Sequence, residues 1–369
     1  MEDLVEIMDS KNFYNGKRVF VTGHTGFKGA WLSFWLARLG ADIAGYALEA
    51  PTQPNLYTLV CNGLYEEEYN ADIRDYSRIR QALSDTRPEI VFHLAAQPLV
   101  RESYIDPMET LTTNIVGTAN LLNAVRELQI DCTLVVVTSD KCYENKEWAY
   151  AYRENDSLGG HDVYSASKAC TEIVTSAWRR SFFSGHECGI RVASARGGNV
   201  IGGGDFSKDR IFPDIYRALS SGHSIPIRNP NAVRPWQHVL DCLNGYLSLA
   251  CTLHEAVRPE NFAGAYNFGP APAACRTVQE MVDAVLRQWP GKCETAADFS
   301  GRHEAARLIL DSSKAMSLLG WRPVWCFSEA VSKTVDWYRS FSCETVAAAR
   351  RCTERQIREF EQACQLHQD

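Results

Sequence analysis

One stretch decides the fold: Leu134-Val135-Val136-Val137-Thr138-Ser139-Asp140-Lys141. It begins as an unbroken apolar run and ends abruptly in two hydroxyls, a carboxyl and an amine. An apolar run of this kind is typical of a strand that is buried on both faces of a parallel sheet. Ligands bind at the carboxyl ends of such strands. The sequence therefore predicts a ligand site at residues 138–141.

A second stretch, Tyr164-Ser165-Ala166-Ser167-Lys168, begins a long helical pattern. Tyr and Lys four positions apart share a helix face, so an ammonium can lie beside a phenol and favour its ionised form. Such a short motif also arises by chance, and an ordinary solvated helix face is the alternative. Together with the carboxyl and hydroxyl groups of residues 138–141, the pair indicates proton and hydride chemistry at one strand end.

A glycine-rich turn near the N-terminus predicts a pyrophosphate cradle. A short strand, residues 17–21, leads directly into Thr22-Gly23-His24-Thr25-Gly26-Phe27-Lys28-Gly29, with the spacing G-x-x-G-x-x-G, and a helical pattern follows. Glycine lets the backbone approach a phosphate closely, and the helix N-terminus attracts negative charge. In this strand–turn–helix context we expect dinucleotide binding.

An acid after the second predicted strand bears on the choice of dinucleotide. Asp42–Leu48 is expected to be that strand, and Glu49 lies twenty residues beyond Gly29. A carboxylate there can accept both hydroxyls of the adenosine ribose and would repel a 2′-phosphate, which favours NAD over NADP. A loop carboxylate without this contact is the alternative.

Later segments continue the alternation of strand and helix. Asp72-Ile73 follows a third strand, where it can meet the adenine, and a fourth strand ends in Leu94-Ala95-Ala96-Gln97, small residues that suit a flat cofactor. His93 in that strand is expected to be a packed core histidine. Thr110–Leu128 is expected to be an amphipathic helix with Asn114 near its start. Alternation of this kind predicts an α/β fold with a doubly wound parallel sheet.

Composition and charge exclude several classes of protein. The 369 residues are 45% apolar and 22% charged, as in ordinary globular proteins, and the net charge of −7 argues against nucleic acid as the main partner. The thirteen cysteines contain no C-x-x-C pair, so neither a zinc ribbon nor a thioredoxin-like site is expected. An odd cysteine number, no leader segment and no membrane-length apolar run indicate a cytoplasmic protein without a metal or a membrane partner.

These residues resemble the extended short-chain dehydrogenase/reductase family. Asp140 after a Thr/Ser pair is similar to its nucleotide-sugar 4,6-dehydratase branch, whose usual signature there is Thr-Asp-Glu. The chain departs from that signature at Lys141, and a lysine there together with Gly-His-Thr-Gly at the turn resembles the members of the branch that use CDP-glucose. The resemblance covers roughly residues 15–340. Its other matching pieces are Asn114-Ile115-x-Gly117-Thr118, Gln97-Pro98-Leu99-Val100-Arg101, Arg234-Pro235-Trp236-Gln237-His238 and Leu319-Gly320-Trp321-x-Pro323.

The resemblance implies a Rossmann-type sheet with a smaller C-terminal α/β lobe for the substrate. The implied division is an NAD-binding domain at 15–195, to which 236–272 returns, a substrate lobe at 196–235 and 273–345, and a C-terminal helix at 346–369. It also implies a homodimer through helices around 107–127 and 161–184, with a tetramer as the alternative. A role of the C-terminal helix in assembly stays open.

The resemblance also assigns residues to the two ligands. The expected NAD contacts are Gly23, His24, Thr25, Gly26, Phe27, Gly29, Glu49, Asp72, Ile73, Leu94, Ala95, Ala96, Gln97, Asn114, Tyr164 and Lys168. The expected contacts to the nucleotide sugar are Arg101, Arg196, Asn199, Arg210, Arg234 and Glu304. Arginine suits a pyrophosphate because its guanidinium makes bidentate contacts. Surface arginines without this role are the alternative for Arg210 and Arg234.

The implied catalytic residues are Ser139, Asp140, Lys141, Tyr164 and Lys168. Lys168 is expected to hold the nicotinamide ribose and to lower the pKa of Tyr164, which takes the proton from the sugar O4 while C4 is oxidised. Ser139, or Thr138 in its place, would share the O4 hydrogen bond.

Lys141, made neutral by desolvation and neighbouring cations, would remove H5, and Asp140 would protonate the departing O6. Orientation of water or binding of the cofactor is the alternative role for Lys141. The expected product is a 4-keto-6-deoxy sugar, as in deoxysugar biosynthesis of the O-antigen type.

Three other functions fit parts of this pattern. A 4-epimerase of the same fold shares Tyr164 and Lys168 but has no use for the acid Asp140. A reductase would use NADPH, against which Glu49 argues. A non-enzymatic NAD-sensing scaffold has no need of the phenol or the lysine. Within the dehydratase branch, GDP-mannose, dTDP-glucose and UDP-GlcNAc are alternative substrates.

Overall fold

The computed structural model describes residues 10–184, 189–271, 274–295, 307–343 and 346–366. Its centre is a seven-stranded sheet in the order β11-β6-β5-β4-β1-β2-β3 with all neighbours parallel. The strands are β1 (Arg18–Thr22), β2 (Asp42–Ala47), β3 (Glu67–Asn70), β4 (Ile90–His93), β5 (Cys132–Val137), β6 (Ile190–Gly197) and β11 (Ala265–Phe268). The predicted parallel sheet is confirmed.

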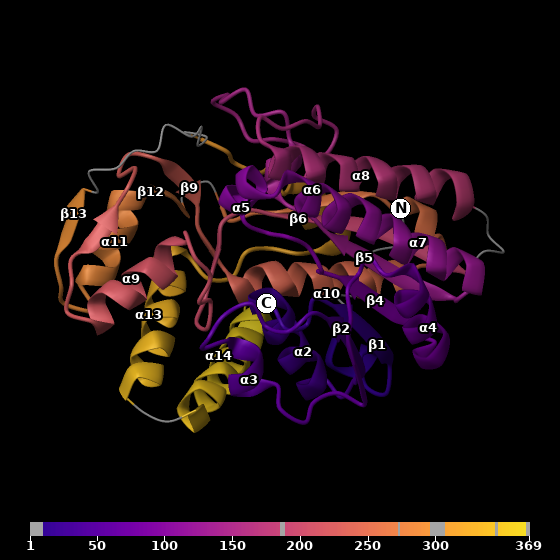
Figure 1. Ribbon diagram of the computed structural model, residues 1–369, viewed down its shortest axis with the longest axis horizontal. Coiled ribbons are helices and arrows are strands. Elements are labelled where there is room, and N and C mark those ends of the chain that lie inside the picture. Colours follow the sequence, from indigo (N-terminus) through magenta and orange to yellow (C-terminus); the bar gives the residue numbers. More distant parts are fainter. Residues whose placement is uncertain (1–9, 185–188, 272–273, 296–306, 344–345, 367–369) are drawn as a thin grey trace.

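Helices cover both faces of this sheet (Figure 1). The apolar residues 134–137 of β5 explain why both faces are covered, because their side chains point alternately to the two faces of the sheet. Val135 and Val137 pack into the core formed with α2 and α10, whereas Leu134 and Val136 pack into the core formed with α4 and α7. The helices concerned are α2 (Phe27–Arg38), α4 (Tyr76–Thr86), α7 (Gly117–Leu128), α8 (Val163–Phe182) and α10 (Val239–Glu255).

A smaller lobe lies beyond the carboxyl end of the sheet and is built from short elements (Figure 1). Its two-stranded pairs are β10 with β7, β12 with β9 and β13 with β8. The bounds are β7 (Val200–Ile201), α9 (Ile211–Ser220), β8 (Ile225–Ile227), β9 (Val233–Pro235), β10 (Gln237–His238), β12 (Cys275–Thr277), α11 (Val278–Leu286) and β13 (Cys293–Thr295). The residue boundaries predicted for the two domains stay a prediction.

The predicted helix Thr110–Leu128 is interrupted. The chain runs through α5 (Val100–Ile105), α6 (Pro107–Leu111) and one π turn at Thr112–Val116 before α7 begins. The π turn contains Asn114, whose side chain bonds to the backbone of Gln97. Single π turns inside α-helices occur frequently at functional sites.

The remaining elements are short or belong to the C-terminal part. They are α1 (Ser10–Phe13), α3 (Leu56–Val60), the 3-10 turns Asp140–Cys142 and Pro259–Asn261, α12 (Ser313–Leu319), α13 (Phe327–Cys343) and α14 (Val346–Leu366). None of the described helices combines the length and apolar character needed to cross a membrane.

Helix α14 packs on the outside of the N-terminal lobe, against α2 and α3 (Figure 1). The Phe360 ring lies fully buried, 5.7 Å from the Trp35 ring and 5.1 Å from the Trp325 ring, centroid to centroid. Trp35 also donates a hydrogen bond of 3.0 Å to Glu361. The last described helix therefore completes the core around the first long one.

We predict that Phe360→Ala lowers the free energy of unfolding by about 3–5 kcal/mol, because it opens a cavity between two tryptophan rings. Denaturant unfolding followed by tryptophan fluorescence measures this. Leu366→Ala is the control, since Leu366 is 78% exposed at the end of the same helix. Equal stability of the two variants would contradict the packing of α14 on α2.

Candidate active site

The glycine turn after β1 is closed so tightly that side chains do not fit. Gly23 has φ of +72°, and a Cβ on it would lie 2.7 Å from the backbone nitrogen of Ala95. A Cβ on Gly29 would lie 2.1 Å from the carbonyl oxygen of Gly23. The turn thus presses against the end of β4 and leads into the N-terminus of α2, as a pyrophosphate cradle requires.

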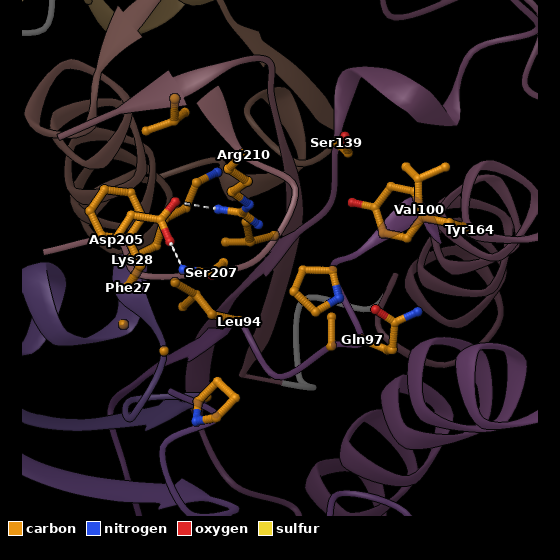
Figure 2. A pocket seen from close by; sticks show the side chains of 18 of the residues that line it. Phe27, Lys28, Leu94, Gln97, Val100, Ser139, Tyr164, Asp205, Ser207 and Arg210 are labelled. Carbon is orange, nitrogen blue, oxygen red and sulfur yellow. Dashed lines mark hydrogen bonds and ion pairs between the residues drawn. The ribbon is translucent and has the colours of Figure 1, made fainter. Parts of the chain in front are cut away.

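One cavity of about 590 Å³ begins at this turn and runs along the carboxyl ends of the strands to the smaller lobe. Figure 2 shows Tyr164, Ser139 and Gln97 on one side of it, with Asp205 and Arg210 on the opposite side. It brings together most of the predicted residues: Gly23, Thr25, Gly26, Phe27, Gly29, Glu49, Asp72, Ile73, Leu94, Ala95, Ala96, Gln97, Ser139, Asp140, Lys141, Tyr164, Lys168, Asn199, Arg210 and Arg234.

His24 is not among the cavity residues, although the sequence predicted a cofactor contact. Its ring is buried beneath Gly45, where an added Cβ would meet it at 2.9 Å. The Nε2 atom lies 2.7 Å from a carboxylate oxygen of Glu68, and burial lowers the pKa of the imidazole. The side chain therefore supports the turn from behind, and its placement does not support the predicted cofactor contact.

Asn114 also lies behind the cavity wall. Its side-chain oxygen accepts a hydrogen bond of 2.8 Å from the Gln97 amide, and its side-chain nitrogen donates one of 2.8 Å to the Ser167 hydroxyl. The amide thus joins the segment after β4 to helix α8 beside Lys168. The amide forms a bridge between two segments that line the cavity, and the cofactor contact of Asn114 stays a prediction.

His93 fulfils the prediction of a core histidine. It is buried in β4, and its two ring nitrogens lie 2.8 Å from the Thr22 hydroxyl and 2.9 Å from the Thr118 hydroxyl. Burial lowers its pKa to about 3. The ring is neutral at physiological pH and ties β1 to α7.

The end of the cavity beyond the glycine turn contains two carboxylates in different surroundings. Glu49 is exposed at the rim. Asp72 is held by Arg74, whose Nε donates bonds of 3.0 and 2.9 Å to its two oxygens, and these bonds lower the pKa of the carboxyl. Glu49 is therefore the more accessible hydrogen-bond acceptor for ribose hydroxyls.

The polar end of β5 forms a compact group at the centre of the cavity. The Ser139 hydroxyl donates to Asp140 over 2.9 Å and accepts from the Lys141 amide over 3.2 Å. Asp140 is buried, and burial raises its pKa although Lys141, Ser139 and Arg234 oppose the rise. A carboxyl with a raised pKa can act as a general acid.

Tyr164 and Lys168 face the same space from helix α8. Both are buried. Burial raises the pKa of Tyr164 to about 12, and a hydrogen bond with Ser139 only partly opposes it. Burial also lowers the pKa of Lys168 to about 8, and the charge of Lys28 lowers it further. The expected lowering of the Tyr164 pKa by Lys168 is wrong for this structure, because desolvation of the phenol dominates.

An ion pair between Glu172 and Arg196 lies directly behind this group, with both side chains 3% exposed. One Glu172 oxygen accepts from Thr138 over 2.5 Å, and the other accepts from Ser194 over 2.7 Å and from Arg196 over 2.9 Å. We call Glu172, Arg196 and their partners Thr138, Ser194 and Tyr143 the ion-pair cluster.

Arg196 was expected to contact the substrate, and its placement does not support that expectation. Its guanidinium donates to the Tyr143 hydroxyl over 2.7 Å and to the Glu154 carbonyl over 3.1 Å, besides Glu172. It lines neither described cavity. The ion-pair cluster instead holds Thr138 and Tyr143, the two residues that flank Ser139–Cys142.

A second cavity of about 990 Å³ adjoins the first and shares Lys141, Asn199, Arg210 and Arg234 with it. Arg101 lines this second cavity and forms an ion pair of 3.1 Å with Asp209. Expected substrate contacts therefore gather where the two cavities meet. Glu304 lies outside the described residues.

Three residues near this junction were not predicted from the sequence: Arg228, Asp205 and Asp209. Arg228 bonds to the same Asp209 over 2.6 Å, and Arg210 is paired with Asp205 over 3.0 Å. Asp209 has φ of +58°. Loop residues without periodic spacing give no signal for such a cluster; only the short distance between Arg228 and Arg234 in the sequence hints at it.

The chain is similar to nucleotide-sugar enzymes. A family model described as GDP-mannose 4,6 dehydratase matches residues 20–334. A CDP-glucose 4,6-dehydratase of Salmonella typhimurium is 47% identical over 90% of this chain and 94% of its own length. A dTDP-glucose 4,6-dehydratase of Streptomyces griseus is 29% identical over 87% of this chain and 93% of its own.

Solved structures share the fold. The UDP-glucose 4-epimerase of Thermus thermophilus in complex with NAD has a TM-score of 0.75 and is 25% identical, over 88% of this chain and 99% of that one. An epimerase of Methanothermobacter thermautotrophicus has a TM-score of 0.77 at 23% identity, over 91% and 96% of the two chains.

We predict that Glu172→Gln lowers the free energy of unfolding by about 3–5 kcal/mol, because it leaves the buried Arg196 charge uncompensated. Denaturant unfolding measures the loss. The double variant Glu172→Gln, Arg196→Met removes both charges and should recover part of that stability. A double variant that is less stable than the single one would contradict the view that an unpaired charge causes the loss.

Proposed function

This chain belongs to the GDP-mannose 4,6 dehydratase family, and from that membership we propose the reaction of its cavity. The chain converts CDP-glucose to CDP-4-dehydro-6-deoxyglucose and water, an NAD-dependent hydro-lyase reaction. The single observation that carries the reaction type is the buried acid Asp140, which lies in one cavity with Tyr164 and Lys168. The 47% identity over most of the chain carries the choice of CDP-glucose.

The cradle and the cavity wall fit NAD. Gly23 and Gly29 leave no room for side chains where a pyrophosphate would approach, and Glu49 stands exposed at the rim where it can accept two ribose hydroxyls. When bound there, NAD would supply the hydride acceptor for C4 of the sugar and the hydride donor for C6. Lys168 would hold the ribose next to the nicotinamide.

The phenolate of Tyr164 would take the proton from the sugar O4, after the phenol has released its own proton to solvent. Its raised pKa makes the neutral phenol the resting form and gives the phenolate, once formed, a high affinity for a proton. Ser139, whose hydroxyl opposes the rise in the pKa of Tyr164, is assigned the second hydrogen bond to the same oxygen. Thr138 is less suited to this role because its hydroxyl donates to Glu172.

Loss of water needs a base at C5 and an acid at O6. Asp140 is assigned the acid, since burial raises its pKa and favours the protonated form. Lys141 is assigned the base, because it follows Asp140 directly and lines both cavities. A 4-epimerase, the second candidate, needs neither group.

The substrate phosphates are assigned to the arginines where the cavities meet. Arg234 and Arg210 line both cavities, and Arg101 lies next to them. Guanidinium groups bind phosphate oxygens in pairs. Asn199 at the turn between β6 and β7 is assigned a bond to phosphate or sugar.

A homodimer is proposed on the outer face of α5 to α8. Large apolar side chains are exposed there: Ile105, Met108, Val116 and Ile173. Exposed apolar patches of this kind mark protein interfaces. We also propose the cytoplasm as the compartment, since the eleven cysteines whose side chains the structure describes are free thiols.

The reaction is tested by incubating the purified chain with CDP-glucose, dTDP-glucose, GDP-mannose and UDP-GlcNAc. We expect a 4-keto product from CDP-glucose and loss of an ¹⁸O label from C6 into water. An epimerised sugar that retains the label would identify the 4-epimerase instead. A dTDP- or GDP-sugar preferred over CDP-glucose would keep the reaction and replace the substrate.

We predict that Lys141→Met retains oxidation at C4, seen as absorbance of the reduced cofactor, but loses exchange of deuterium from solvent into C5. The methionine fills the same space and cannot accept a proton. Tyr164→Phe is the matched control and should lose both signals, because general acid–base groups contribute about 10²–10⁴-fold. Wild-type deuterium exchange in the Lys141 variant would exclude this residue as the base.

We predict that Glu49→Arg weakens binding of NAD and strengthens binding of NADP. The change replaces an acceptor of ribose hydroxyls by a cation that attracts a 2′-phosphate. Calorimetric titration with each dinucleotide measures the two affinities. An unchanged preference would show that Glu49 is a loop carboxylate only.

A further inference from the structure

Lys28 is a cavity residue to which neither the sequence motif nor the proposed reaction assigns a role. It belongs to the first turn of α2, directly before Gly29, and is half-buried. It lines the same cavity as Tyr164, Lys168 and Gly197 (Figure 2). Its backbone belongs to the cradle, but its ammonium reaches further along the floor of the cavity.

The Lys28 ammonium forms no ion pair with any of the described residues. Within the described residues no carboxylate lies within 4 Å of its Nζ, which instead lies 3.4 Å from the Tyr246 hydroxyl and 5.8 Å from the centre of that ring. Tyr246 and its neighbour Cys242 are fully buried. Most cavity arginines, by contrast, are paired with aspartates, as Arg210 is with Asp205.

The charge of Lys28 also reaches Lys168. After burial, it is the largest cause of the lowered pKa of Lys168. A Cβ on Gly197 would lie 3.6 Å from the Lys28 Nζ, so the ammonium sits beneath the turn that follows β6. Two ammonium groups therefore share one poorly solvated part of the cavity.

We propose that Lys28 makes the cavity favour the reduced, neutral nicotinamide ring over the oxidised, cationic ring. The inference rests on the proposed function, in which Lys168 holds the ribose that carries this ring. An unpaired cation that acts on Lys168 acts on the adjoining ring as well. Only the oxidised ring is positively charged, so Lys28 repels one form and leaves the other unaffected.

The expected size of the effect follows from Coulomb's law. Two unit charges about 8 Å apart, at an effective dielectric constant of about 20, change an equilibrium by roughly 30-fold. Oxidation of the sugar at C4 converts the cationic ring to the neutral one. Lys28 would therefore favour the oxidised sugar and hold the enzyme in that state until dehydration is complete.

The test is the ratio of the dissociation constants for NAD and NADH, measured by calorimetry on the full chain without substrate. We expect Lys28→Met to lower the ratio Kd(NAD)/Kd(NADH) by about 10-fold or more. Lys28→Arg keeps the charge and should keep the ratio within about 3-fold. Lys17→Met, which removes an ammonium paired with Glu89 at the opposite end of β1, should leave it unchanged.

Two outcomes would overturn the inference. Equal weakening of NAD and NADH in Lys28→Met would show that Lys28 contacts the pyrophosphate, which both forms share. An unchanged ratio with unchanged affinities would show that the ammonium does not act on the ring. If the unaltered chain bound neither dinucleotide, the proposed function itself would fail. Lys28→Gln repeats the measurement should the methionine variant not fold.

Discussion

The Glu172–Arg196 pair is the interaction on which the site depends. It lies where the polar end of β5, the end of β6 and helix α8 converge, and each of these contributes a partner to it. A buried ion pair contributes little net stability, because desolvation offsets much of the attraction. Loss of one partner is strongly destabilising, however, because the other charge then stays buried without compensation. The pair therefore fixes one arrangement of the three segments. Ser139, Asp140 and Lys141 follow Thr138 directly, so their positions depend on that arrangement.

Burial sets the proton affinities of the central groups in opposite directions. It raises the pKa of Asp140 and Tyr164 and lowers that of Lys168, since loss of water disfavours whichever form carries charge. Tyr164 thus remains a neutral phenol in this structure, although Lys168 is on the same helix face. Groups in such a cavity respond strongly to a charge that arrives with a ligand, because little water screens it.

The sequence predicted the sheet and most of the cavity because both follow from local patterns. The apolar run before Thr138 and the glycine spacing after Thr22 each specify a strand end and the groups that follow it. Asn114, His24 and Arg196 carried the expected residue types, but their side chains point behind the cavity. A side chain in the cavity wall can point into the cavity or away from it. Its direction depends on packing partners that are distant in sequence, such as Glu68 and Glu172. The role proposed for Lys28 was not predicted either. It depends on the absence of an ion-pair partner among the described residues, which the sequence does not show.

The packing of α14 on α2 has a consequence for synthesis of the chain. Trp35 and its hydrogen-bond partner Glu361 are 326 positions apart, so the outer face of α2 is covered only after residue 361 has left the ribosome. Until then an apolar surface of the N-terminal lobe faces solvent, and exposed surface of this kind makes nascent chains prone to aggregation. Contacts this remote in sequence also slow folding, because a long loop must close before they form. The nascent lobe is thus a natural client for chaperones that bind apolar segments.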